Sequence, residues 1–237
     1  HTHTMDMLVA LCVSERTGDR DLLDRALKGF EYGIHAGEGL VGFFPEAVHE
    51  SGPEPTGTHG YGYLTSEHCE VADMVSVGIM LSHLGVDKWD DVDRWVRNQM
   101  AEDQLTWTGW LTDGHMDLSN RKIPAERLAM FRHDGWFTTD RVPERTLGGF
   151  SGWPGANDWA GHAITPHIGL TIMNCCSANG SRTLHHVWRN IVHYQDGKLR
   201  VNLLLNRASK WADIDSYIPY TGRVDVKAKR KLDLEIR

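Results

Sequence analysis

Two adjacent cysteines mark the part of the sequence with the clearest chemical potential. Cys175 and Cys176 lie in the stretch NCCSANGSRTLHH, just ahead of a predicted helix that starts near Ala178, and the whole chain has only four cysteines. Adjacent thiols can be buried in a core, joined in a strained vicinal disulfide, active in redox chemistry or bound to a metal ion. The amides and the positive dipole end at a helix start favour the thiolate, which is the nucleophilic and metal-binding form of cysteine.

The stretch SEHCEVADM supplies matching ligand types on a second element. Glu67 and Cys69 are two residues apart, so they would point about 200° apart on a regular helix but would share one face of an extended chain. The apolar stripe of the following helix begins only after Cys69, and we therefore expect both residues on extended chain. Together with Cys175 and Cys176 they would offer one oxygen and three sulfurs to a tetrahedral Zn²⁺ ion.

Apolar residues recur at helical spacing through the first two-thirds of the chain. Asp19 is a candidate N-cap for the second helix, and the last helix is expected from about residue 178 to 193. Two long stretches, 38–64 and 105–174, indicate loops, which at this length are often functional. Cys12, on the first stripe, is interpreted as a core residue. The stripes are Met5, Leu8, Val9 and Cys12; Leu23, Leu27, Phe30 and Ile34; Val71, Met74, Val75, Ile79 and Met80; Trp89, Val92, Trp95, Val96 and Met100; and Leu184, Val187, Trp188 and Ile191.

The pattern changes to a period of two near residue 195. Alternating apolar residues predict a first strand over about 199–205, and the same alternation recurs over 224–228 and 232–236. The strands resemble the start of a β-sandwich. The sequence therefore predicts a mainly α chain, with a helical domain over 1–194 and the beginning of a β-sandwich domain over 195–237.

Composition excludes several classes of partner. The formal charge is −7, and no Lys/Arg-rich run precedes the last strand, so nucleic acid is not expected to bind. No apolar run approaches the roughly 18–20 residues that span a bilayer, and no signal-peptide pattern is present. The chain opens inside a helical pattern and closes inside a strand pattern, which suggests a segment of a longer protein. We expect a cytoplasmic location and leave homo-oligomerisation open.

The cysteine motifs resemble those of glycoside hydrolase family 127, the β-L-arabinofuranosidases. The likeness lies in SEHC at 66–69 and in CCSANGSRTLHHVWRNIVHYQDGKLRVNLLL, which starts at Cys175. That family has Glu-x-Cys leading into a helix, then Cys-Cys followed by small residues, Asn and a helix, and then an Asp-Gly turn before a strand. Here Asp196 and Gly197 occupy the turn, and DDVDRWVRNQMAEDQL is similar to the helix between the two motifs. The resemblance implies an (α/α)6 barrel followed by β-sandwich domains.

The resemblance also implies an unusual mechanism. Cys175 would be the nucleophile of a retaining glycosidase and would bind zinc together with Glu67, Cys69 and Cys176. Zinc coordination keeps sulfur deprotonated, so that it can attack an anomeric carbon and form a thioglycosyl intermediate. The substrate would be a carbohydrate, and specifically a furanoside such as a β-L-arabinofuranoside.

The family's acid/base carboxyl, a Glu in a Gly-rich loop before the Glu-x-Cys motif, is less well matched. Glu46, Glu50 and Glu54 lie in the corresponding region, and none has the family's neighbours. Local similarity favours Glu46, in PEAV, and each of the three could equally be a solvated loop carboxylate. His3 matches a family histidine that touches sugar, or is a surface histidine. Three further residues could line a sugar subsite or cap the core: Trp153, Trp159 and His167.

Two other classes of function fit the same residues. A zinc-stabilised, non-catalytic carbohydrate-binding or scaffold protein would keep the metal ligands and lack the acid/base. A redox protein with a vicinal disulfide at Cys175 and Cys176 would leave Glu67 and Cys69 without a role.

Overall fold

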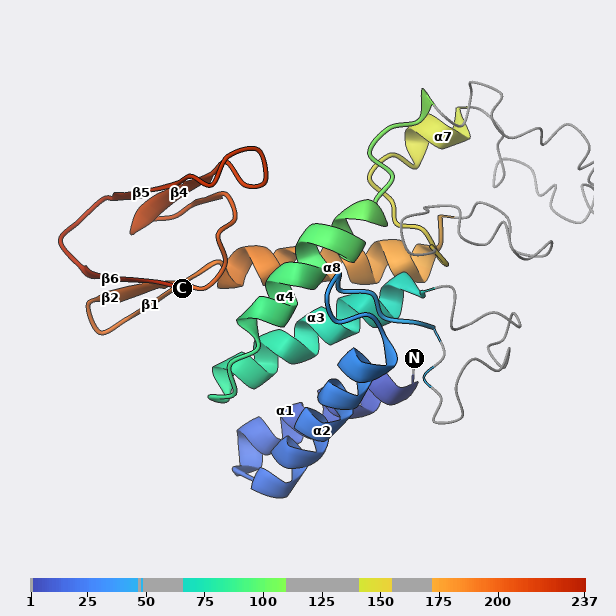
Figure 1. The fold of residues 1–237 in the computed structure, drawn as a ribbon, viewed down its shortest axis with the longest axis horizontal. Coiled ribbons are helices and arrows are strands. Elements are labelled where there is room, and N and C mark those ends of the chain that lie inside the picture. Colours follow the sequence, from blue (N-terminus) through green and yellow to red (C-terminus); the bar gives the residue numbers. More distant parts are fainter. Residues whose placement is uncertain (1, 47, 49–65, 110–140, 155–171) are drawn as a thin grey trace, which may run out of the picture.

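The computed structural model describes residues 2–46, 48, 66–109, 141–154 and 172–237 (Figure 1). Helices precede strands, as the change in hydrophobic period predicts. The helical elements are α1 (Thr2–Thr17), α2 (Arg20–Ala36), α3 (His68–His83), α4 (Trp89–Trp95), the π-helix η1 (Val96–Met100), α7 (Val142–Arg145) and α8 (Asn174–Asn190). None of the described helices is both long and apolar enough to cross a membrane.

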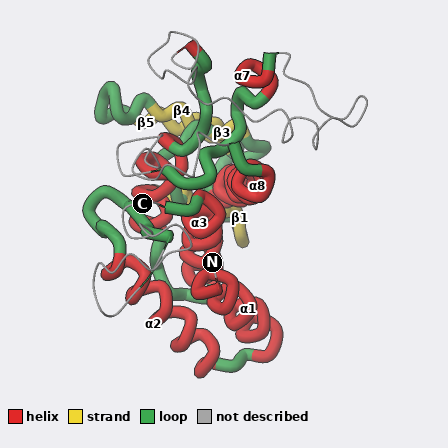
Figure 2. The backbone as a smooth tube through the Cα atoms, turned by 90° about the vertical axis from the view of Figure 1, so that its right-hand side faces the viewer, coloured by secondary structure: helices red, strands yellow, loops and turns green. Residues whose placement is uncertain are grey.

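Helix α3 lies at the centre of the helical part. It runs between α8 on one side and the α1–α2 pair on the other, an arrangement that Figures 1 and 2 show from two directions. Every residue from His68 to Ile79 is buried, including polar ones, because neighbours surround the helix on all sides. The stripe predicted for α4 and η1 is likewise buried, from Trp89 to Met100.

The buried face of α1 differs from the predicted one. Met5, Val9 and Cys12 are exposed, whereas Met7 and Leu11 enter the core. The buried face also carries Thr4 and Ser14, so polar residues conceal it from a search for apolar spacing. The prediction that Cys12 is a core residue was therefore wrong. Asp19, in contrast, is the N-cap of α2, and its side chain accepts from the amides of Asp21 and Leu22.

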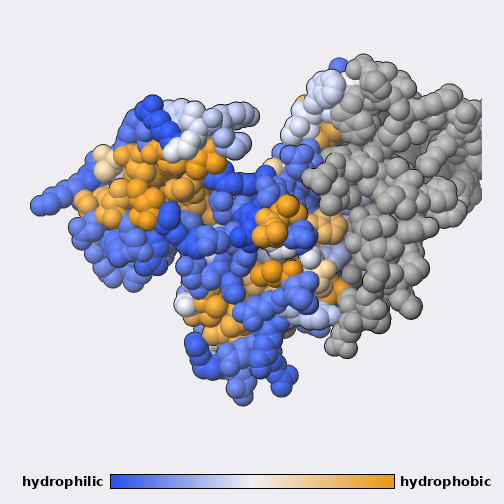
Figure 3. Space-filling model, viewed as in Figure 1, coloured by the Kyte–Doolittle hydropathy of each residue, from blue (hydrophilic) through white to orange (hydrophobic). Residues whose placement is uncertain are grey.

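Two three-stranded sheets follow the helices. The strands are β1 (Val192–Gln195), β2 (Lys198–Val201), β3 (Arg207–Ala208), β4 (Ala212–Ser216), β5 (Val224–Ala228) and β6 (Asp233–Ile236), in the orders β1-β2-β6 and β3-β4-β5. β2 pairs antiparallel with β1 and parallel with β6. Asp196 and Gly197, both with positive φ, form the predicted turn between β1 and β2. Apolar side chains gather over the strands (Figure 3).

The strand predicted over 199–205 ends early, and the last helix ends before residue 193. α8 stops at Asn190, and β1 occupies residues 192–195. After Val201 the chain turns back onto the end of α8, where the amides of Asn202 and Leu203 donate to the carbonyl of Ile191. Three consecutive buried residues result, from Val201 to Leu203, so the alternation that predicted the strand is not a strand pattern there.

A buried carboxylate ties three helices together. Asp73 on α3 accepts from the Thr4 hydroxyl of α1 at 3.1 Å and from Nη2 of Arg182 on α8 at 3.0 Å. Asp73 is 1% exposed, while Arg182 remains 46% exposed. Asp73 lies one turn beyond Cys69, so this network fixes α3 against α1 and α8 close to the cysteines.

We predict that Asp73→Ala lowers the free energy of unfolding by about 1–3 kcal/mol, because it leaves the buried Thr4 hydroxyl without this partner and removes the link to Arg182. Chemical denaturation monitored by circular dichroism measures the loss. Asp215→Ala is the control, since the ion pair of Asp215 with Lys227 is exposed and its loss should change stability by less than about 0.5 kcal/mol. Equal losses in the two variants would contradict the role given to Asp73.

Candidate metal centre

Four side chains converge where α3 and α8 begin. The ligand atoms of Glu67, Cys69, Cys175 and Cys176 all lie within 4.8 Å of one another, and such a group could hold a metal ion. Cys69 and Cys176 are buried, Glu67 is partly buried and Cys175 is exposed. The four residues predicted as a cluster therefore come together, with one thiol open to solvent.

The start of α3 explains how Glu67 and Cys69 reach the same place. Glu67 is the N-cap residue, with extended φ and ψ of −103° and 120°, and its side chain makes no capping hydrogen bond. The helix begins at His68, so Cys69 lies in the first turn and not on extended chain as predicted. Only Glu67, and not Cys69, has the extended backbone that was predicted for both residues. The Glu67 carboxylate does not bond to the helix amides, so it can turn toward the cysteines.

α8 begins at Asn174, four residues earlier than predicted. Cys175 and Cys176 are thus inside the first turn, where amides have no intrahelical partner. The N-cap, Met173, supplies no side-chain hydrogen bond. Burial raises the pKa of the Cys175 thiol, and the amide of Cys176 opposes that rise only in part.

The three sulfurs are spaced as zinc ligands would be. The Sγ atoms of Cys69 and Cys176 lie 3.5 Å apart, and those of Cys175 and Cys176 lie 3.9 Å apart. Zn–S bonds of about 2.3 Å in a tetrahedron place two sulfurs about 3.8 Å apart. The observed separations bracket that value, so the thiols fit a tetrahedral ion with little rearrangement.

Each thiol affects the ionisation of the others. The hydrogen bond with Cys176 lowers the pKa of Cys69 to about 7, and the Asn179 side chain adds to this effect. The same bond with Cys69 raises the pKa of Cys176, while burial and the nearby Cys69 charge raise the pKa of Cys175. Without a cation Cys69 is therefore the thiol that ionises first, and a divalent ion would allow the remaining thiols to deprotonate.

A short segment, residues 148–154, links the two helix starts. The carbonyl of Pro154 accepts from the amide of Ser66, just ahead of α3. The carbonyl of Gly152 accepts from the amide of His68, the first residue of α3. At the α8 side, the amide of Phe150 donates to Oγ of Ser177 at 3.1 Å. This segment holds both helices in place, so the ligands do not depend on their mutual contact alone.

His68 forms a buried support beneath the ligands. Its Nδ1 lies 2.7 Å from Oδ2 of Asp103, and both side chains are almost fully buried. Burial raises the pKa of Asp103, and the bond with His68 opposes that rise. The His68 ring stacks on Phe150 at 4.1 Å, and its Nε2 faces Gly180 of α8. These contacts hold the His68 side chain in place, and with it the backbone between Glu67 and Cys69.

The other predicted site residues lie outside the cluster of four side chains or outside the described part of the chain. Nε2 of His3 lies 2.9 Å from the Gly29 carbonyl and its ring contacts Tyr32, so its described contacts are with α2. Glu46 is partly buried, two residues after Phe44. Neither belongs to the group of four ligands. Trp153 lies in the 148–154 segment. Four predicted residues fall outside the described part of the chain: Glu50, Glu54, Trp159 and His167.

Sequence reasoning missed the residues that support the ligands. Asn179 was visible as the Asn that follows the cysteine pair, and Gly180 beside it is a glycine within a helix, which often marks close packing. His68 lies between two predicted ligands. Phe150 and Asp103 had no signal, because their relation to His68 exists only in the folded chain.

Comparisons with models of known protein families and with curated proteins find no match for this chain.

We predict that Gly180→Ala destabilises the protein and weakens its metal site. An added Cβ would lie 2.6 Å from both His68 Nε2 and Phe150 Cδ2, which is closer than real contacts allow. Overpacking of this kind costs about 1–3 kcal/mol, which exceeds the gain of up to about 1 kcal/mol in helix propensity. Thermal unfolding and competition with a zinc chelator measure the two effects. Gly222→Ala, where the added atom meets nothing within 4 Å, is the control. A stabilised Gly180→Ala protein with unchanged zinc affinity would contradict this packing.

Proposed function

We propose that this protein is a zinc-dependent retaining glycoside hydrolase with Cys175 as its nucleophile, acting on a furanoside such as a β-L-arabinofuranoside. The observation that carries the proposal is the unequal exposure of the thiols. Cys69 and Cys176 are buried, where they can serve only as ligands, and Cys175 is open to a substrate. The likeness of the cysteine motifs to those of glycoside hydrolase family 127 supplies the reaction class.

Zinc is the proposed metal because of the donor set. Three thiolates and one carboxylate suit a borderline-soft ion, whereas magnesium and calcium prefer oxygen ligands alone. A bound zinc ion would keep the sulfurs deprotonated at neutral pH and would offset two of their negative charges. The residues that would hold it are Glu67, Cys69, Cys175 and Cys176.

The proposed reaction proceeds in two displacements. The Cys175 thiolate attacks the anomeric carbon, and the glycosidic C–O bond breaks while the departing oxygen takes a proton from a carboxyl group. Water then attacks the same carbon, its proton passes to the carboxylate, and the C–S bond breaks to restore the thiolate. Two inversions retain the configuration at the anomeric carbon. Glu46 is the proposed acid/base, and His3 is a proposed sugar contact.

The family's architecture is part of the proposal. The helices would belong to an (α/α)6 barrel and the two sheets to a β-sandwich. The two-residue connection between α1 and α2 supports a barrel built from helix pairs. The stacking of Tyr194 on Trp211, with ring centroids 5.2 Å apart, joins β1 to the chain at β4 and supports facing sheets.

A second candidate is a non-catalytic, zinc-stabilised carbohydrate-binding or scaffold protein. It is favoured by the hydrogen bond between the Cys69 and Cys176 thiols, because this contact and the segment 148–154 make the cluster a structural link between α3 and α8. A cluster with that role needs no acid/base.

We predict that Cys175→Ser abolishes glycoside cleavage while zinc remains bound, because a serine hydroxyl has too high a pKa to supply a comparable nucleophile. Hydrolysis of an aryl β-L-arabinofuranoside at matched zinc occupancy measures this. Cys69→Ser is the comparison: removing a buried ligand should lower zinc affinity and thermal stability first, and activity in proportion to the zinc lost.

Mass spectrometry of the quenched wild-type reaction should find one glycosyl group on the peptide that contains Cys175. If zinc-loaded Cys175→Ser hydrolyses the substrate at a near wild-type rate, Cys175 is not the nucleophile. If the wild-type protein binds zinc but cleaves no furanoside, the non-catalytic alternative is favoured.

A further inference from the structure

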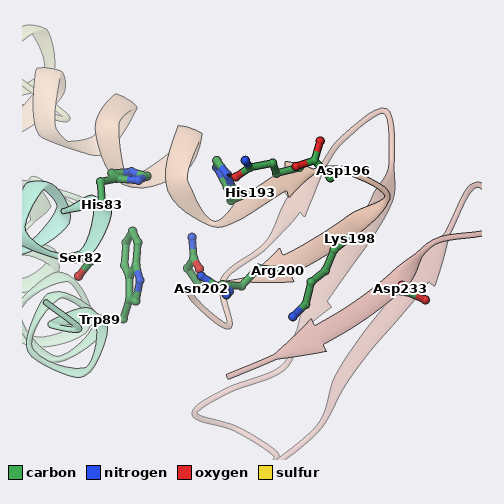
Figure 4. A pocket seen from close by; sticks show the side chains of 10 residues that line it. Ser82, His83, Trp89, His193, Asp196, Lys198, Arg200, Asn202 and Asp233 are labelled. Atoms are coloured by element: carbon green, nitrogen blue, oxygen red, sulfur yellow. Dashed lines mark hydrogen bonds between the residues drawn. The ribbon is translucent and has the colours of Figure 1, made fainter. Parts of the chain in front are cut away.

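A cavity lies near the C-terminal end of α3, away from the candidate metal centre at the start of that helix. It has a volume of about 510 Å³ and lies between the C-terminal end of α3, the start of α4 and the sheet of β1, β2 and β6 (Figure 4). Ser82, on its wall, is thirteen residues beyond Cys69 on α3, which places it about 20 Å along the helix axis from the thiols. This cavity is therefore separate from the proposed active site.

Asn202 lines the cavity, and its side chain is held in one orientation. Its Nδ2 donates to the carbonyl of Asn190 at 3.0 Å, and its amide donates to the carbonyl of Ile191 at 2.8 Å. A carbonyl oxygen only accepts, so Nδ2 must face Asn190 and Oδ1 must point away from it. Oδ1 is buried and has no hydrogen-bond partner in the described part of the chain. Asn202 is only 4% exposed, so a buried acceptor is held in a fixed direction.

The tautomer of His83 can be assigned from its neighbours. Nδ2 of Asn190 donates to the carbonyl of His186, so Oδ1 of Asn190 is the atom that faces His83. His83 Nε2 lies 2.6 Å from that oxygen and must carry the proton. In the neutral ring Nδ1 then bears a lone pair. The cavity wall thus contains an acceptor whose orientation is set by α8.

Donors and an aromatic surface complete the wall. Trp89 is 6% exposed, and its ring packs against the His83 ring in an edge-to-face arrangement, with centroids 5.8 Å apart. The nitrogen edge of Trp89 is turned toward the side of the cavity where Asn202 lies (Figure 4). Arg200 and His193 also line the cavity, and Nε of Arg200 bonds to Glu235 at 2.9 Å. Lys198 also lines the cavity and pairs with the same carboxylate, and Asp196 and Asp233 line it as well, so two cations are matched by two carboxylates and the site is not strongly positive.

We infer that this cavity binds a neutral, hydroxyl-rich ligand, and specifically one unit of a saccharide. A sugar hydroxyl both donates and accepts, so it can donate to the Asp196 and Asp233 carboxylates or to His83 Nδ1 and accept from the Trp89 indole N–H. An inorganic anion could use only the donors and would face the Asp196 and Asp233 carboxylates. A simple cation could use only the acceptors. The inference does not rest on cleavage at Cys175, because no residue of the metal centre lines this cavity.

The test is a titration of the ¹⁵N-labelled full chain with L-arabinose, a neutral pentose, followed at the side-chain amide of Asn202. We expect a saturable shift with a midpoint in the millimolar range. Trp89→Phe keeps an aromatic ring and removes the N–H, and it should raise the midpoint by roughly five- to ten-fold, the effect of one lost hydrogen bond. Trp188→Phe is the matched control, because Trp188 is exposed on α8 and does not line the cavity. Its midpoint should match that of the wild-type protein.

Three results would overturn the inference: no saturable shift with L-arabinose, equal midpoints for the two tryptophan variants, or saturation by inorganic phosphate without saturation by the sugar. Repeating the titration in the Cys175→Ser protein separates this site from the proposed catalytic one. The shift at Asn202 should persist there with an unchanged midpoint, whether or not the wild-type protein cleaves furanosides.

Discussion

The structure depends on the meeting of two helix starts, those of α3 and α8. Their first turns bring the Sγ atoms of Cys69 and Cys176 to 3.5 Å, more than a hundred residues apart in the chain. Like-charged thiolates at that distance repel each other, and each must also be desolvated. The contact is stable only with one shared charge or with a cation between the sulfurs. The surrounding elements support that contact. Asp73 links α3 to α1 and α8, and the segment 148–154 forms hydrogen bonds at the starts of both α3 and α8.

The meeting of the two helix starts also explains why Cys69 and Cys176 are buried while Cys175 is exposed. A thiol at the second position of the α3 helix and one at the third position of α8 face inward, where Asn179 and the neighbouring sulfur are their partners. Cys175, one residue earlier, faces outward. Position within a single helical turn is thus enough to separate an exposed thiol, the proposed nucleophile, from a buried thiol, the proposed ligand. His68 and Phe150 make this turn rigid, since neither ring can move without displacing Gly180.

Sequence reasoning predicted the cluster of Glu67, Cys69, Cys175 and Cys176 and missed the residues that support it, for a physical reason. Cysteine and glutamate in an uncommon spacing carry a chemical signal, and the change from period 3.6 to period 2 locates the passage from helices to strands. The partnership of His68 with Asp103 is a tertiary fact, with no local pattern to reveal it. The buried face of α1 was misassigned because Thr4 and Ser14 lie on it, and the strand over 199–205 was overextended because Asn202 turns back to the end of α8. Tertiary contacts override local patterns at each of these places.

The most direct test of the central claim is X-ray absorption at the zinc edge of the zinc-loaded full chain. The account predicts one zinc per chain, with three sulfur scatterers at about 2.3 Å and one oxygen at about 2.0 Å. Cys175→Ser should reduce the sulfur count to two while zinc stays bound. A first shell of nitrogen or oxygen alone, or a sulfur count unaffected by Cys175→Ser, would contradict the four-residue site and the mechanism built on it.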